Sequence, residues 1–353
     1  VNETTDVAPS HEYSAGGEYT ITISITDIND GAFPSIKFDN DKDSDKDKIL
    51  SIPNLGDVGW TSFESAFYGC QNLGLILGGN TSNVTSMNKM FRGATLADPD
   101  TSSWNTSNVT SMNKMFKNAI TANPDTSSWD TSKVTTMWGL FSGATSANPD
   151  TAEWNTSNVT IMKTVFKGAT SANPDTSSWV TSNVTTMWKM FNGATSANPD
   201  TAEWNTSNVT NMNSLFTGAI LANPDTSAWN TSNVTKMQYM FDGATLANPS
   251  TSAWDVGAVT DMTTIFENSG ISDTNYSNFL NMAASTCGEG SDCEGSNIDI
   301  GTAPAGYYGD QSSSRTILEA RNWTIKDTGL SDDFLSVWQT SINGESITIP
   351  TVE

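Results

Sequence analysis

The sequence is poor in the residues on which catalysis and nucleic-acid binding depend. It has one histidine, three cysteines, and 16 lysines and arginines against 39 aspartates and glutamates, which gives a formal net charge of -23. Such an acidic excess disfavours contact with a phosphate backbone. A Ser-His-Asp arrangement would have to use His11, and neither a Gly-rich phosphate loop nor a zinc signature is present. We therefore expect neither an enzyme nor a nucleic-acid-binding protein.

Long apolar runs are also missing. No stretch approaches the roughly 20 apolar residues that cross a bilayer. No basic start followed by an apolar segment marks a signal peptide at the beginning of the sequence. The sequence thus predicts no membrane insertion, and we expect a mature form or an excised piece.

The sequence contains instead a 25-residue internal repeat. A phenylalanine recurs at this spacing from Phe91 to Phe266, a methionine stands four residues before each one, and a tryptophan recurs from Trp104 to Trp254. A fixed period of this length is typical of a solenoid, in which each unit buries its apolar face only against its neighbours.

Each repeat predicts two short elements. Val109, Met112 and Phe116 have helical spacing, which indicates one short helix. A glycine such as Gly143 follows, where a left-handed residue ends a helix. The Asn-Pro-Asp-Thr-Ser stretch then predicts a turn and a short extended segment, and stacked segments of this kind form a parallel sheet. The expected fold class is an α/β repeat solenoid of short parallel strands and short helices.

The repeats resemble a known family. The pattern Trp-Asn-Thr-Ser-Asn-Val-Thr-x-Met-x-x-Met-Phe-x-Gly-Ala is similar to the BspA-like leucine-rich repeats of bacterial surface proteins, the DUF285 or 25-residue lipoprotein repeat. Residues 11–23 and 334–350 resemble strands of PKD-like β-domains. The resemblance implies leucine-rich-repeat-like coils in an extracellular or cell-surface protein that acts in adhesion or in a surface filament.

Five segments follow from the repeat and its flanks. Residues 1–50 are expected to be a partial PKD-like β segment with an acidic loop, 51–79 an N-terminal capping coil, 80–270 eight leucine-rich-repeat-like units, 271–330 a C-terminal cap, and 331–353 a β-strand extension. Two arrangements of the ends remain open. The chain is one period of a larger tandem protein, or its last strand pairs with the first segment of another copy. Either one produces a head-to-tail array of identical copies.

Acidic and cysteine-containing segments are the first candidate sites. An acidic loop carries alternating carboxylates that suit calcium, although the intervening lysines also fit a solvated loop: Asp39, Asp41, Asp43, Asp45 and Asp47. No cofactor is required otherwise. Cys287 and Cys293 are separated by five small or polar residues, which favours a disulfide loop in an oxidising compartment over a metal site.

Regular polar columns are the second kind of candidate site. A strand-face ladder consists of Asp100, Thr101, Asp125, Thr126, Asp150, Thr151, Asp175 and Thr176. Stacked carboxylates repel unless each caps a turn or shares a cation, and capping is the preferred interpretation. Stacked threonines predict hydroxyl ladders, with a flat ice-binding array as the alternative. The tryptophan and methionine columns are read as core rather than as sugar-stacking or soft-metal sites.

Sequons are abundant because the repeat contains Asn-Thr-Ser-Asn-Val-Thr. The candidate acceptors for N-linked glycans are Asn80, Asn83, Asn105, Asn108, Asn155, Asn158, Asn205, Asn208, Asn230 and Asn233. Taken together, the sequence favours a non-enzymatic surface or filament module whose partners are protein or glycan ligands or further copies of itself. The alternative is a displayed ligand-binding module for glycan, calcium or ice.

Overall fold

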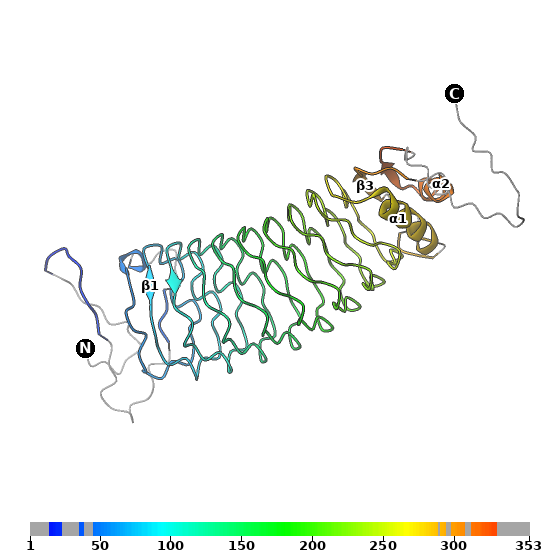
Figure 1. Cartoon of the computed structure of the whole chain (residues 1–353). Helices are drawn as coiled ribbons and strands as arrows, with labels where there is room; N and C mark the ends of the chain where they lie inside the picture. The colour runs from blue at the N-terminus through cyan, green and yellow to red at the C-terminus, as the bar shows by residue number, and fades with distance from the viewer. Residues whose placement is uncertain are drawn as a thin grey trace, which may run out of the picture.

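The computed structural model describes residues 14–22, 35–38, 45–288, 290–293, 298–307 and 312–329. The middle of the chain is a stack of 25-residue coils that runs from β1 (Leu75–Ile76) to α1 (Asp273–Thr286), and the molecule is elongated along this stack (Figure 1). The other elements are η1 (Lys46–Lys48), β2 (Asp98–Pro99), β3 (Asp299–Thr302), α2 (Ser312–Ala320) and β4 (Thr324–Lys326).

Backbone hydrogen bonds join each coil to the next. Strands β1 and β2 pair in parallel, and single-residue parallel bridges then link residues 25 apart, from Ser86 with Ser111 to Lys236 with Asp261. In the following segment every second N–H donates to the next coil, for example that of Phe116 to the carbonyl of Leu140 at 2.8 Å. Each coil therefore depends on its neighbour for its hydrogen bonds as well as for its core.

The prediction of a short helix in each coil is wrong. Residues 113–118 and their equivalents form consecutive turns, and among the described residues α-helix occurs only in α1 and α2. The N–H groups of Lys114, Phe116 and Asn118 donate to the next coil at 2.7–2.8 Å, so they are not available for helical bonds. Lys114 also has a φ of 56°, which interrupts a right-handed helix. An eight-residue helix is marginal by itself, and the bonds between coils prevail.

The extended segment was also predicted in the wrong part of the repeat. Beyond β2, the Asp-Thr-Ser segments form turns, whereas the parallel bridges follow the column from Ser86 to Asp261. That column lies two residues after each core valine, inside the segment expected to be helical. The predicted strand face is therefore a turn corner, and its threonines are buried.

The apolar columns form the core. The valine, methionine, phenylalanine and tryptophan columns are almost fully buried from Val84 to Phe266. Adjacent rings stack along the axis: the Phe116 and Phe141 centroids are 5.4 Å apart and those of Trp129 and Trp154 are 6.2 Å apart. At the end of the turn segment, Gly193 has a φ of 71°, and Asn118 takes the equivalent place with a φ of 60°. Both residue types tolerate the left-handed conformation that this corner needs.

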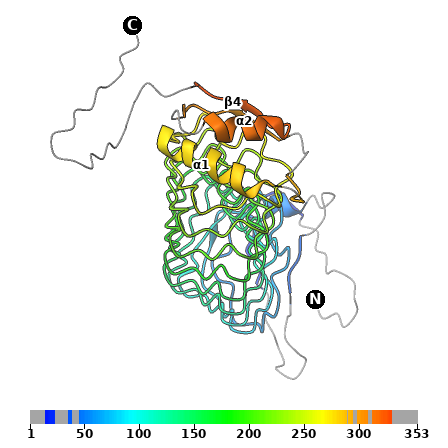
Figure 2. The same ribbon diagram turned by 90° about the vertical axis from the view of Figure 1, so that its right-hand side faces the viewer.

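A small cap covers the last coil. Helices α1 and α2 lie across the end of the stack with β4 beside them (Figure 2). Ser272 caps α1 by accepting a bond from the N–H of Asn275, and Phe279 packs edge-on against Phe266 with 5.0 Å between centroids. In the same cap, strands β3 and β4 pair in parallel. Among the described residues, no helix has the length and apolar character needed to span a membrane.

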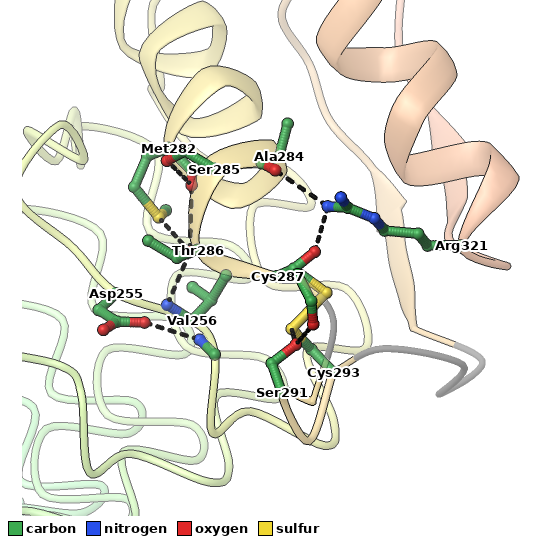
Figure 3. The surroundings of a disulfide bond; sticks show 12 residues. Asp255, Val256, Met282, Ala284, Ser285, Thr286, Cys287, Ser291, Cys293 and Arg321 are labelled. Carbon is green, nitrogen blue, oxygen red and sulfur yellow. Dashed lines mark hydrogen bonds between the residues drawn. A yellow bond between two sulfur atoms is a disulfide. The ribbon is translucent and has the colours of Figure 1, made fainter.

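A disulfide follows α1. Cys287 is bonded to Cys293, and both side chains are buried (Figure 3). Arg321 donates to the carbonyls of Ala284 and Cys287, and the N–H of Val256 in the last coil donates to Thr286 Oγ1 at 3.3 Å. The end of α1 is thus joined both to the stack and to the segment after α2. The third cysteine, Cys70, is buried and takes no part in this disulfide.

Candidate functional site

One exposed corner of the stack carries a column of carboxylates, here named the acid column: Asp100, Asp125, Asp150, Asp175, Asp200 and Asp225. Each side chain accepts a bond from the backbone N–H two residues ahead, at 2.9–3.2 Å. The hydroxyls of Ser102, Ser127 and Ser177 add a second bond at 2.6–2.7 Å. The geometry is that of a capped turn, the arrangement that the sequence favoured for these aspartates.

These bonds favour the charged form of the carboxyl. The serine hydroxyl, followed by the backbone N–H, lowers the pKa of Asp100, Asp125 and Asp175 below the ordinary aspartate value. Because the folded-state pKa is depressed, this contribution to stability is present above the unfolded pKa and is lost as the pH falls through the folded one. These three carboxylates therefore remain charged in mildly acidic solution.

A Ser177→Ala variant should raise the pKa of Asp175, because the carboxylate loses the hydroxyl bond that contributes most to its shift. The titration midpoint can be followed by carbon-detected NMR of the side-chain carboxyl. Ser178→Ala is the matched control, since that hydroxyl donates to the carbonyl of Ala152 at 2.7 Å and does not reach Asp175. Equal midpoints in the two variants would contradict the assigned cause.

The threonines of the predicted ladder lie inside the molecule. Thr101, Thr126, Thr151 and Thr176 are at most 1% exposed. Each hydroxyl donates to the carbonyl of the aspartate in the next coil, as Thr151 does to Asp175 at 2.5 Å. A second buried column behaves alike: Thr106 donates to the carbonyl of Asp130 at 2.9 Å. These are the expected hydroxyl ladders between coils, and because these threonines are buried they do not form the flat exposed array of the ice-binding alternative.

A different threonine column is exposed. It begins with Thr85 and Thr110, and each hydroxyl in it is directed to the carbonyl of the preceding threonine at 3.2–3.5 Å. Sequence reasoning did not separate this column from the buried ones, because all three have the same period. Its position directly after the core valine could have distinguished it, because a side chain at that position faces away from the core.

The sequon asparagines are of two kinds. The first of each pair, such as Asn105, is exposed, and its Oδ1 accepts a bond from Ser107 N–H at 3.0 Å; Asn80, Asn155, Asn205 and Asn230 do the same. In the second kind, Nδ2 donates to a serine carbonyl of the preceding coil at 2.7–2.8 Å, in Asn108, Asn158, Asn208 and Asn233. Asn83 is exposed. The nitrogen that a glycan would occupy is therefore engaged between coils in the second kind.

The acidic loop is described only in part. Asp39, Asp41 and Asp43 lie outside the described residues. Asp45 pairs with Lys48, and the carbonyl of Asp47 accepts a bond from Asn72 at 2.7 Å. Among the described residues, no group of three or more His, Cys, Asp or Glu side chains is arranged to hold a metal ion. Calcium at this loop stays a prediction.

Sequence reasoning missed a line of basic residues, here named the basic stripe: Lys89, Arg92, Lys114, Lys117, Lys163, Lys167 and Lys189. All of them lie one to five residues after a core methionine, on the turn segments of four coils, and the coil of Met137 between them carries none. Lys114 Nζ lies 3.5 Å from the ring centroid of Trp138, and Lys163 Nζ lies 4.6 Å from that of Trp188. Burial, followed by the charge of Arg92, lowers the pKa of both Lys114 and Lys117. Tabulating the variable positions of the repeat for charge could have found the stripe.

Two shallow hollows mark the surface. The larger, of about 430 Å³, lies beside the acid column between Ala152, Asn155 and Val180. The smaller, of about 200 Å³, is lined by Lys46, Tyr68 and Arg92 at the N-terminal end of the basic stripe. Both are open to solvent.

Comparison with known proteins identifies the family. The family described as "Mycoplasma protein of unknown function, DUF285" matches residues 61–179 and again residues 160–279, which together are more than half of the chain. The chain belongs to this family. No curated protein and no solved structure matches it. The resemblance to DUF285 is thereby confirmed, whereas the leucine-rich-repeat class and the PKD-like flanks remain predictions.

Proposed function

We propose that the chain is a non-enzymatic extracellular module that acts in adhesion or in the structure of a cell surface or fibre, as a leucine-rich-repeat-like solenoid. One observation carries the proposal: many of the polar side chains that recur along the stack join one coil to the next. Buried threonines donate to the next coil, and the Asn-Pro asparagines accept from it, as Asn148 does from Asn173 N–H at 2.9 Å. Repetition of this kind favours a long, uniform surface over a single reaction centre.

The location can be tested on the producing cells. Antibodies raised against residues 80–270 should label the outer surface of intact cells in immunogold electron microscopy, and external protease should remove the label. Cells permeabilised before labelling serve as the control for total protein. Label that appears only after permeabilisation would overturn an extracellular role.

Linkage of copies end to end is part of the same proposal. The segment expected to form a pairing strand, residues 331–353, lies outside the described residues, so the support comes from the sequence pattern alone. Negative-stain images of the full chain should contain rods longer than one stack, and removal of residues 331–353 should leave single rods. Equal lengths in the two samples would exclude pairing by this strand.

The alternative function is a displayed binding module for glycan, calcium or ice. The exposed Thr110 column favours no one of these ligands over another, because its hydroxyls are directed to backbone carbonyls. The single measurement that would promote this alternative is saturable binding of an immobilised glycan or of calcium by the purified chain.

A further inference from the structure

We infer that two copies of this chain associate side by side, with the basic stripe of one copy packed along the acid column of the next. This goes beyond the proposed function, because it names a contact surface and a partner and holds wherever the protein is located.

The first argument is that the basic stripe is not neutralised within the chain. Among the described residues, ion pairs occur at the acidic loop and in the C-terminal cap, and none includes a residue of the stripe. Lys114 is repelled electrostatically by four nearby positive charges, those of Arg92, Lys117, Lys89 and Lys163. In a chain with 39 acidic residues, this concentration of cations that make no ion pair among the described residues is unfavourable for the single molecule. A negative partner would relieve the repulsion.

The second argument concerns the aromatic rings in the stripe. Trp138 is 37% exposed, yet Lys114 of the preceding coil and Lys163 of the following coil both lie over its ring, at 3.5 and 5.2 Å from the centroid. Trp188 likewise lies close to Lys163 and Lys189, at 4.6 and 5.0 Å. Rings covered in this way have little free face on which a sugar could stack, and they hold the ammonium groups in a line. The stripe is therefore suited to a partner with a row of negative charges.

The third argument is that the acid column supplies such a row with the same spacing. The acid column repeats once per coil, the basic residues stand in four of the five coils from Met87 to Met187, and parallel-bridged coils rise by about 4.8 Å. The basic stripe spans four coil steps, from Lys89 to Lys189, or roughly 19 Å, and the acid column spans five steps, from Asp100 to Asp225, or roughly 24 Å. Two copies in parallel can thus set several lysines against several carboxylates without a mismatch that grows along the axis.

The fourth argument is that the two surfaces do not neutralise each other in one molecule. Asp100 and Lys114 are 14 residues apart in a circuit of 25, which places them about half a turn apart with the core between them. A contact between such different surfaces is heterologous, so each copy keeps one free basic stripe or acid column after pairing. The association therefore extends into a row of parallel stacks instead of closing as a dimer.

The experiment compares two neutralised variants of the full chain. In the first, glutamine replaces four basic residues: Lys114→Gln, Lys117→Gln, Lys163→Gln and Lys167→Gln. In the second, asparagine replaces four acids: Asp100→Asn, Asp125→Asn, Asp150→Asn and Asp175→Asn. Asparagine keeps the oxygen that caps each turn, as Asn105 and Asn155 do at the neighbouring corner where Asp130 also stands. Circular dichroism checks that both variants are folded.

Sedimentation velocity at low ionic strength provides the measurement. The wild-type chain should form concentration-dependent oligomers that dissociate as salt is added, because exposed charge pairs are screened. Each variant alone should associate about tenfold or more weakly. A mixture of the two should form a one-to-one complex, since one offers an intact acid column and the other an intact basic stripe. The matched control removes four acids outside both surfaces, with Asp57→Asn, Asp255→Asn, Asp299→Asn and Glu319→Gln, and should associate like wild type.

Three outcomes would overturn the inference. The wild-type chain remains monomeric at low salt, or the acid-column variant associates as strongly as wild type, or the control is weakened as much as the two test variants. Dextran sulfate is the probe for the competing occupant. If the wild-type chain stays monomeric but binds dextran sulfate through the basic stripe, the partner is an anionic polymer and not a second copy.

Discussion

A Phe166→Ala variant should lose about 3–5 kcal/mol of free energy of unfolding, the usual range for truncating a buried aromatic side chain. Phe166 is fully buried and stacks between Phe141 and Phe191, with centroids 5.8 and 5.5 Å away. The cavity cannot close easily, because the backbone on both sides is bonded between coils: Phe166 N–H donates to Met190 and the carbonyl of Val165 accepts from Phe141, both at 2.9 Å. The variant therefore loses both burial and ring contacts.

Urea unfolding, followed by tryptophan fluorescence and circular dichroism, measures this loss. Leu246→Ala is the control, because it also shortens a large apolar side chain to alanine. Leu246 is 55% exposed, so the effect on the free energy of unfolding should lie within about 0.5 kcal/mol. A linear stack can also unfold in separate segments once a central interface is weakened. Non-coincident transitions in the variant would agree with this expectation, whereas a loss no larger than that of Leu246→Ala would contradict the role given to the phenylalanine column.

An Arg315→Leu variant should destabilise the C-terminal cap by about 3–5 kcal/mol, because it leaves a buried carboxylate without its cation. The side chain of Asp327 is 1% exposed and is bound by the Arg315 guanidinium. Tyr276 donates its hydroxyl to Asp327 at 3.1 Å, and Gly329 N–H donates at 3.0 Å. Burial, followed by the charge of Asp327, raises the pKa of Tyr276, so the phenol stays protonated and keeps donating.

Two comparisons isolate the buried charge as the cause. The double variant Arg315→Leu with Asp327→Asn removes the unpaired carboxylate but keeps an acceptor oxygen, and it should recover much of the loss. Lys326→Leu breaks an exposed ion pair, in which the Lys326 and Asp299 side chains lie 3.8 Å apart at 59% and 44% exposure, and should change stability by less than about 1 kcal/mol. Differential scanning calorimetry can rank the three. If Lys326→Leu and Arg315→Leu are equally harmful, the buried-charge explanation is wrong.

The sequence predicted the period and the core but not the backbone conformation of each coil. Val109, Met112 and Phe116 point inward as expected, since their burial requires only that these positions face one side. Their helical spacing was nevertheless misleading. A run of turns with a left-handed residue such as Lys114 places the same side chains on one side, and hydrogen bonds to Leu140 and Ser142 decide in its favour. Bonds between residues about 24 positions apart leave no mark in a local apolar pattern.

The candidate surfaces were predicted unevenly for a similar reason. Capping by Asp125 could be expected from its place after Asn-Pro, because the acceptor and the N–H of Ser127 are local. The burial of Thr126 could not, since its partner is the carbonyl of Asp150 in another coil. The basic stripe escaped notice because Lys114 and Lys163 stand at slightly different positions of the repeat and come together only in the folded stack.

The hydrogen bonds between coils have a consequence for how such a protein changes between generations. Because each coil offers the next the same carbonyls, and receives the same ones from the coil before, no coil is tied to a particular neighbour. An in-frame loss of residues 158–182 would join Ser157 to Asn183 and leave every column continuous. Recombination between the near-identical units can therefore lengthen or shorten the molecule by whole units while the core is preserved. The length of the stack is thus a property that selection can adjust in steps of one coil.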